Sequence, residues 1–197
     1  MMMQMSVSPV FGMSPKDPDN NPLLVTSALP YGAPDFNNIK TTDWLPAFQV
    51  GIQQQRDNIN RIVTNKRKAA FKNTILAFEE SGATLERVTN IFFCLTSAHK
   101  TTEIAEIEKK VVPMLKELEN EISFNKPLFQ RVKYVYDHEY SKLKGEDKKL
   151  LEETYKRFVR SGALLSDGQT TWLMEIFTDF TGMSSPDASA QHKARGF

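Results

Sequence analysis

The residues best suited to catalysis in this chain are a histidine and a glutamate that are adjacent, His138 and Glu139. On a helix, the pattern H-E-x-x-H places two histidines one turn apart to bind zinc and supplies a glutamate as general base. The second histidine of that pattern would fall at position 142, which is Lys142. An ammonium group repels a divalent cation, and a metal site needs three or four converging ligands. The sequence therefore predicts a surface histidine at position 138 and no metal ligand there.

The other histidines and the single cysteine offer no better site. His99 follows an apolar helical stretch, where the helix dipole favours a cation, so we expect a role at the helix end. His192 lies in a polar tail and supports no inference. Cys94 lies within the apolar stretch 91–95, so we expect a small buried side chain rather than a nucleophile. Neighbouring glutamates diverge on a helix, and no P-loop, G-x-S-x-G or cysteine pair is present. The sequence thus predicts no catalytic, cofactor-binding or metal-binding residue.

One basic cluster, Lys66, Arg67, Lys68 and Lys72, is the strongest charged feature. Nucleic-acid binding would require interleaved aromatic residues or a longer basic face, and only Phe71, an expected core residue, is near. The whole chain carries 25 Lys+Arg and 24 Asp+Glu, a net charge of +1. No apolar run approaches the roughly 18 residues of a membrane span. We therefore expect a solvated loop, and neither nucleic acid nor membrane as a partner.

Apolar residues at helical spacing predict an all-α fold, a bundle of about seven helices. No strand-like alternation extends beyond four residues. Asp43 is expected to cap the first helix and Thr101 or Thr102 the fourth, which Pro113 should kink near Lys109. Asn125 with Pro127 marks the start of the fifth helix. The expected helices run from Asp43 through Ile62, from Asn73 through Glu80, from Thr84 to His99, from Thr101 or Thr102 through Ile122, from Asn125 through His138, from Gly145 to near Gly162, and from Ser166 through Phe180.

Composition divides the chain into three parts. Residues 1–20 are rich in proline and turn formers and are expected to be a flexible leader. Residues 21–168 form the helical domain, beginning with a proline-rich extended arm (21–34) whose leucines and Tyr31 should dock on the helices. Residues 169–197 combine a divergent helix around Trp172 with a Ser/Ala-rich tail expected to be disordered.

The N-terminus and the cysteine content bear on the compartment. Met1 to Met13 contain no Lys or Arg and make a poor signal peptide. A single cysteine is compatible with a reducing compartment. Cytoplasm is expected, and the periplasm is the alternative if the N-terminus is the trimmed end of a signal peptide.

Many short pieces between residues 21 and 165 occur in the order found in one known family. They are Asn21-Pro22-Leu23, Leu29-Pro30-Tyr31, Ala33-Pro34-Asp35-Phe36, Pro46-Ala47-Phe48, Gly51-Ile52-Gln53-Gln54-Gln55, Phe71-Lys72-Asn73-Thr74-Ile75, Glu79-Glu80-Ser81-Gly82, Leu128-Phe129, Tyr136-Asp137 and Phe158-Val159-Arg160-Ser161-Gly162-Ala163-Leu164-Leu165. This stretch resembles the N-terminal region of the bacterial peptidyl-dipeptidases, which belong to the thimet-oligopeptidase-like zinc metallopeptidases.

The resemblance implies a fold and a role. Full-length members are all-helical ellipsoids with a deep channel, and their N-terminal helices form one wall. They use zinc, held downstream by H-E-x-x-H and a further glutamate, to release C-terminal dipeptides from unfolded oligopeptides. None of those zinc-site residues has a counterpart here. The resemblance therefore implies an N-terminal fragment that shapes the substrate channel, is inactive alone, and has the oligopeptide and the missing catalytic half as partners.

The sequence departs from the family after Gly168. This departure motivates the hypothesis of a truncated or frame-disrupted version of the longer enzyme, which sequencing of the downstream DNA would test. The alternative is a free-standing helical protein-interaction module without catalysis. In that case the helix around Trp172 and Phe177 would close the core.

Overall fold

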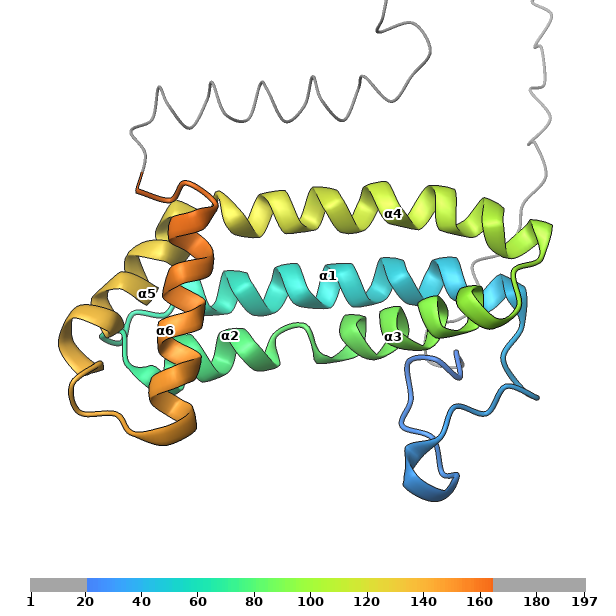
Figure 1. Cartoon of the computed structure of the whole chain (residues 1–197), viewed down its shortest axis with the longest axis horizontal. Helices are drawn as coiled ribbons and strands as arrows, with labels where there is room; N and C mark the ends of the chain where they lie inside the picture. The colour runs from blue at the N-terminus through green and yellow to red at the C-terminus, as the bar shows by residue number, and fades with distance from the viewer. Residues whose placement is uncertain (1–20, 165–197) are drawn as a thin grey trace, which may run out of the picture. The chain divides into compact units, whose positions relative to one another are not determined.

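A computed structural model describes residues 21–164, and all regular secondary structure in that range is helical (Figure 1). Five helices have fourteen or more residues: α1 (Trp44–Val63), α3 (Ala83–Ala98), α4 (Thr102–Ser123), α5 (Lys126–Glu139) and α6 (Gly145–Arg160). A four-residue helix, α2 (Ala77–Glu80), continues a π-helical segment, Phe71–Leu76. None of these helices is long and apolar enough to cross a membrane.

The all-α prediction is confirmed over the described residues, but the number of helices is not. Five long helices occur in this range, whereas about seven helices were expected. The second expected helix is the π-helical segment followed by α2, and the side chain of Asn73 accepts from the N–H of Ala70 at the start of that segment. The seventh expected helix, the leader and the tail lie outside the described residues.

The described residues fall into two compact units. The first unit comprises residues 21–60 and 78–116, and the second comprises residues 61–77 and 117–164. Each unit has its own apolar core.

The core of the first unit is built on aromatic rings from α1 and α3, which lie side by side (Figure 1). Phe92 of α3 is fully buried, and its ring centre lies 5.1 Å from that of Trp44 and 5.3 Å from that of Phe48. Both contacts have the edge-to-face geometry that aromatic pairs prefer. The helical spacing of these residues in the sequence predicts this shared face.

Gly51 allows α1 to approach α3 closely. A Cβ atom at Gly51 would lie 3.1 Å from the Cα of Leu85 and 3.2 Å from its Cδ1. We expect Gly51→Val to lower the free energy of unfolding by about 1–3 kcal/mol, because overpacking forces the helices apart. Urea unfolding followed by circular dichroism measures the effect. The matched control is Gln54→Val, at an exposed position of the same helix, and equal losses in the two variants would contradict the proposed close approach.

The core of the second unit lies where α5 packs on α6, and both contact the Phe71–Leu76 segment. Its fully buried residues include Ile75, Leu128, Val132, Val135 and Leu151.

Local sequence signals position the helices of the second unit. The Oδ1 atom of Asn125 accepts a hydrogen bond of 2.9 Å from the N–H of Leu128, so the predicted cap of α5 is confirmed. Gly162, with φ of 87°, ends α6, and the N–H of Ala163 donates to the carbonyl of Phe158. This is the glycine-based helix ending that the sequence predicts.

The ends of the other long helices agree with the sequence signals in part. Thr101 caps α4 through its hydroxyl, which accepts from the N–H of Ile104 at 3.3 Å. α4 then continues through Pro113 to Ser123 as one helix. Before α1, the carboxylate of buried Asp43 accepts from the N–H of Lys40 at 2.9 Å.

Candidate functional site

The residues that resemble a zinc motif have structural roles. α5 ends at Glu139, so the stretch from His138 to Lys142 is not one continuous helix. His138 is exposed, as predicted, and its ring stacks on Tyr134 with the ring centres 4.0 Å apart. The Oε2 atom of Glu139 accepts a hydrogen bond of 2.9 Å from the N–H of Phe71. Glu139 therefore satisfies a backbone donor at the start of the π-helical segment, a role that suits a carboxylate.

No three side chains of His, Cys, Asp or Glu come together in residues 21–164 in a way that could hold a metal ion. The predicted burial of Cys94 is wrong, because this residue is exposed. Position 94 lies about 200° around the helix from buried Phe92, so an apolar run does not place every member on the inner face. His99 follows the last residue of α3 and donates its backbone N–H to the carbonyl of Leu95 at 2.8 Å, the helix-end position expected for it.

Lys66, Arg67 and Lys68 of the basic cluster lie on an exposed loop, as predicted, whereas Lys72 lies in the π-helical segment. A half-buried arginine holds the loop. Arg131 of α5 donates from Nη1 to the carbonyl oxygens of Asn65 at 3.0 Å and Arg67 at 3.3 Å. Its Nη2 donates to Oδ1 of Asn73 at 3.2 Å. Asn73 also donates from Nδ2 to the carbonyl of Lys68 at 2.9 Å. Burial lowers the pKa of Arg131, since desolvation disfavours the charged form.

Sequence reasoning missed this arginine clamp. The available signal was the position of Arg131, which follows Leu128 by three residues and precedes Val135 by four, on the apolar face of α5. The structure also brings an aromatic ring to the basic loop, since Nζ of Lys68 lies 5.2 Å from the ring centre of Tyr134.

A second clamp, in the first unit, holds the two ends of an apolar loop, residues 24–39. Nδ2 of Asn21 donates to the carbonyl of Asp43 at 2.8 Å, and this hydrogen bond joins the residues that flank the loop. Oδ1 of Asn21 accepts from the N–H of Leu23 at 3.0 Å. From α3, Nη2 of Arg87 donates to the carbonyl of Leu23 at 3.0 Å, and the Leu23 side chain is buried.

Between these pinned ends, the apolar loop exposes large hydrophobic side chains. The exposed fractions are 55% for Val25, 44% for Leu29, 107% for Tyr31 and 51% for Phe36. The prediction that Tyr31 docks on the helices is therefore wrong, and of the three leucines in residues 21–34 only Leu23 is buried. Tyr31 has φ of 60°, a left-handed conformation that costs a residue with a Cβ atom about 1–2 kcal/mol.

The second unit carries a strip of stacked aromatic rings along α5 and α6. Tyr136 stacks on Tyr140 at 4.8 Å and on Tyr155 at 4.1 Å between ring centres, and Tyr155 stacks on Phe129 at 5.9 Å. The three tyrosines are half-buried. The rings therefore help to fix α6 on α5.

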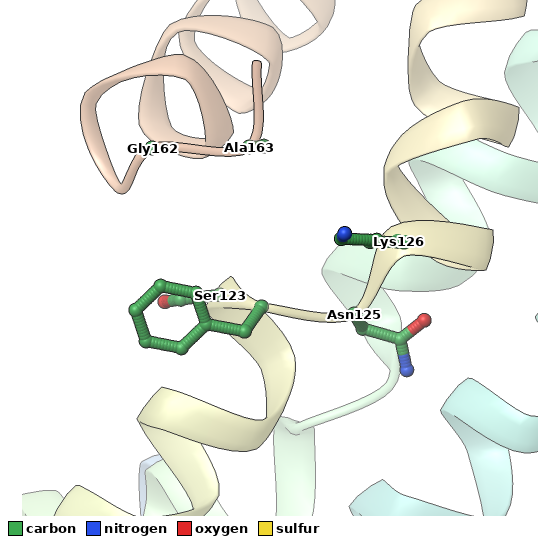
Figure 2. A pocket seen from close by; sticks show the side chains of 6 residues that line it. Ser123, Asn125, Lys126, Gly162 and Ala163 are labelled. Carbon is green, nitrogen blue, oxygen red and sulfur yellow. The ribbon is translucent and has the colours of Figure 1, made fainter. Parts of the chain in front are cut away.

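A small hollow is lined by the turns after α4 and after α6, at Ser123, Phe124, Asn125, Lys126, Gly162 and Ala163 (Figure 2). Its volume of about 10 Å³ suits a single water molecule. It does not have room for a peptide side chain.

Comparison with known proteins identifies the relationships of the chain. It is 40% identical over 166 residues to dipeptidyl carboxypeptidase of Escherichia coli, and 39% identical over the same length to that of Salmonella typhimurium. The match covers 84% of this chain in both cases. Over this stretch the chain is a homologue of the dipeptidyl carboxypeptidases. The resemblance found in the sequence is thereby confirmed.

The homology concerns part of those enzymes. The chain spans about a quarter, 24%, of the length of both dipeptidyl carboxypeptidases. Oligopeptidase A of Escherichia coli is more distant, with 24% identity over 143 residues, which are 72% of this chain and 20% of that protein. No family model matches the chain.

Proposed function

We propose that residues 21–168 form the N-terminal, channel-wall domain of a zinc peptidyl-dipeptidase, and that they shape the substrate passage without catalysing hydrolysis themselves. The observation that supports this most strongly is the 40% identity that covers most of this chain but only 24% of the E. coli enzyme. The family reaction is the release of C-terminal dipeptides from oligopeptides. The substrate class proposed for the complete enzyme is therefore an unfolded oligopeptide.

Zinc does not fit the side chains of the described residues. His138 stacks on Tyr134, while the carboxylate of Glu139 accepts from the N–H of Phe71. We therefore assign zinc binding to the portion of the dipeptidyl carboxypeptidases that this chain does not span, and no step of hydrolysis to residues 21–164.

Side-chain contacts that hold the loops in place support a role as a channel wall. A wall that admits only narrow peptides must keep its loops and helices in place. The Arg131 clamp satisfies carbonyl groups of the loop after α1, and the Asn21–Arg87 clamp satisfies the carbonyl groups of Asp43 and Leu23, which flank the apolar loop. Such contacts restrict loop motion, because the basic loop is held within its length and the apolar loop is held at both of its ends.

A chimera tests this proposal. Residues 21–164 would replace the matching stretch of E. coli dipeptidyl carboxypeptidase, and release of C-terminal dipeptides from an unfolded oligopeptide would be measured. We expect the chimera to retain at least a tenth of the activity of the E. coli enzyme, and the isolated 197-residue chain to show no activity with added zinc.

The control is the E. coli enzyme with the matching stretch deleted, which should be inactive. A chimera that binds zinc and folds but hydrolyses nothing would contradict the channel-wall role. Activity of the isolated chain would contradict the assignment of catalysis to the remaining portion. A free-standing interaction module would also fail to support activity in the chimera.

A further inference from the structure

Exposed apolar side chains are concentrated in one place in the described part of the chain. Four of its six exposed large hydrophobic residues, Val25, Leu29, Tyr31 and Phe36, lie within the apolar loop. The other two, Val112 and Leu164, lie far from it in sequence. Single exposed apolar residues are normal on protein surfaces, whereas a cluster marks an interaction site.

Hydrogen bonds fix both ends of this loop in position. The Asn21–Asp43 hydrogen bond closes its base, and Arg87 fixes one end to α3. Figure 1 shows the loop, in blue, projecting from the helices of the first unit. A pre-positioned loop loses less conformational entropy on binding than a free segment does.

Tyr31 has the features of a residue that a partner would bury. Its side chain is fully exposed, its φ is 60°, and no contact recorded among residues 21–164 involves its ring. Asparagine or glycine would adopt this conformation with less strain. A strained, solvent-exposed aromatic ring carries two unfavourable features at once, and burial of the ring in a partner would offset them.

The low charge of the loop indicates what kind of surface it would bind. Asp35 is the only charged residue between positions 21 and 39, and its carboxylate accepts from the side-chain amide of Asn38 at 2.6 Å. The complementary surface must therefore be apolar and uncharged, with a recess for an aromatic ring. Binding should change little with salt, because no ion pair is formed.

We propose that the apolar loop is the docking surface for the remaining portion of a dipeptidyl carboxypeptidase, whether that portion is joined to this chain or separate. This inference rests on the proposed function. We choose this partner from the lengths of the proteins. The chain spans 24% of each dipeptidyl carboxypeptidase, so about three quarters of each of those enzymes has no counterpart in it. That portion must be fixed against the matched stretch, and the apolar loop carries four of the six exposed large hydrophobic residues in the described part of the chain.

The test compares one triple variant, Leu29→Ser, Tyr31→Asn and Phe36→Ser, in two settings. In the isolated chain, the temperature midpoint of unfolding should change by less than about 2 °C, because surface substitutions have small effects. In the chimera with E. coli dipeptidyl carboxypeptidase, the midpoint should fall by at least about 5 °C, since the same side chains are then buried. The dipeptide-releasing activity of the chimera should fall in parallel.

Val112→Ser is the matched control, because Val112 is 47% exposed and lies on α4 rather than in the apolar loop. An equal fall for Val112→Ser, or no fall for the triple variant in an active chimera, would overturn the docking inference alone. An inactive parent chimera would overturn the proposed function and this inference with it. A fall of at least about 5 °C in the isolated chain would also overturn the inference. In that case, sedimentation of the chain with and without residues 1–20 would identify a second copy or the leader as the occupant.

Discussion

Replacing Phe92 by alanine is expected to lower the free energy of unfolding of this chain by about 3–5 kcal/mol, the range for truncation of a buried phenylalanine. Phe92 has no exposed surface, and its ring makes edge contacts with both Trp44 and Phe48. Trp44 and Phe48 lie on α1 and cannot collapse into the space left on α3, because the two helices are already in close contact at Gly51 and Leu85. A cavity therefore remains, and the contacts of its lining are lost.

Urea unfolding monitored by tryptophan fluorescence and by circular dichroism measures this effect. The matched control is Phe36→Ala, since Phe36 is 51% exposed, and we expect a change within about 0.5 kcal/mol. A loss below about 1 kcal/mol for Phe92→Ala would show that the first unit does not have the core described above.

Replacing Arg131 by methionine is expected to lower the free energy of unfolding by about 2–3 kcal/mol. The guanidinium donates to two loop carbonyls and to the side chain of Asn73. A hydrogen bond from a charged donor contributes about 1.5–3 kcal/mol, and methionine fills the space of the stem without donating. The loop from Asn65 to Asn73 should then open more often.

Two measurements check the clamp. Unfolding in urea gives the total loss, and amide hydrogen exchange should show faster exchange at Ala70, whose N–H donates to Asn73 at 3.0 Å. Lys133→Met is the matched control, because the exposed Lys133–Asp137 pair should contribute no more than about 1 kcal/mol. Unchanged exchange at Ala70 in Arg131→Met would show that the arginine does not hold the loop.

The sequence allowed prediction of those parts of the fold that depend on periodic apolar residues and on helix-end chemistry. Val88 and Phe92 are four residues apart and share a buried face, and Asn125 and Gly162 delimit α5 and α6 as expected. Each of these signals depends on residues that are close in the sequence, so a single sequence is enough to predict the helix faces and the helix ends.

The features that were missed depend on contacts between distant residues. Arg131 holds a loop that lies more than fifty positions earlier, and Glu139 accepts from Phe71. No local pattern distinguishes such residues from surface charges. The exposure of Cys94 and Tyr31 was missed for a related reason, since hydrophobicity alone does not tell which side of a helix or loop faces the core.

For the candidate site, the sequence predicted only that the zinc-like residues would not bind a metal. Position 142, where the second histidine of an H-E-x-x-H pattern would fall, is a lysine, and this is visible in the sequence. The alternative role of Glu139 as a partner of a backbone N–H required the structure. Recognition of the apolar loop required both the sequence and the structure. The sequence predicts a proline-rich arm, and the structure shows which of its side chains are exposed.

The metal content of the purified 197-residue chain tests the central claim most directly. After incubation with excess zinc and removal of free metal, we expect elemental analysis to find far less than one zinc ion per chain. One tightly held zinc ion per chain, lost together with peptide hydrolysis on treatment with a chelator, would contradict the assignment of catalysis to the portion that this chain does not span.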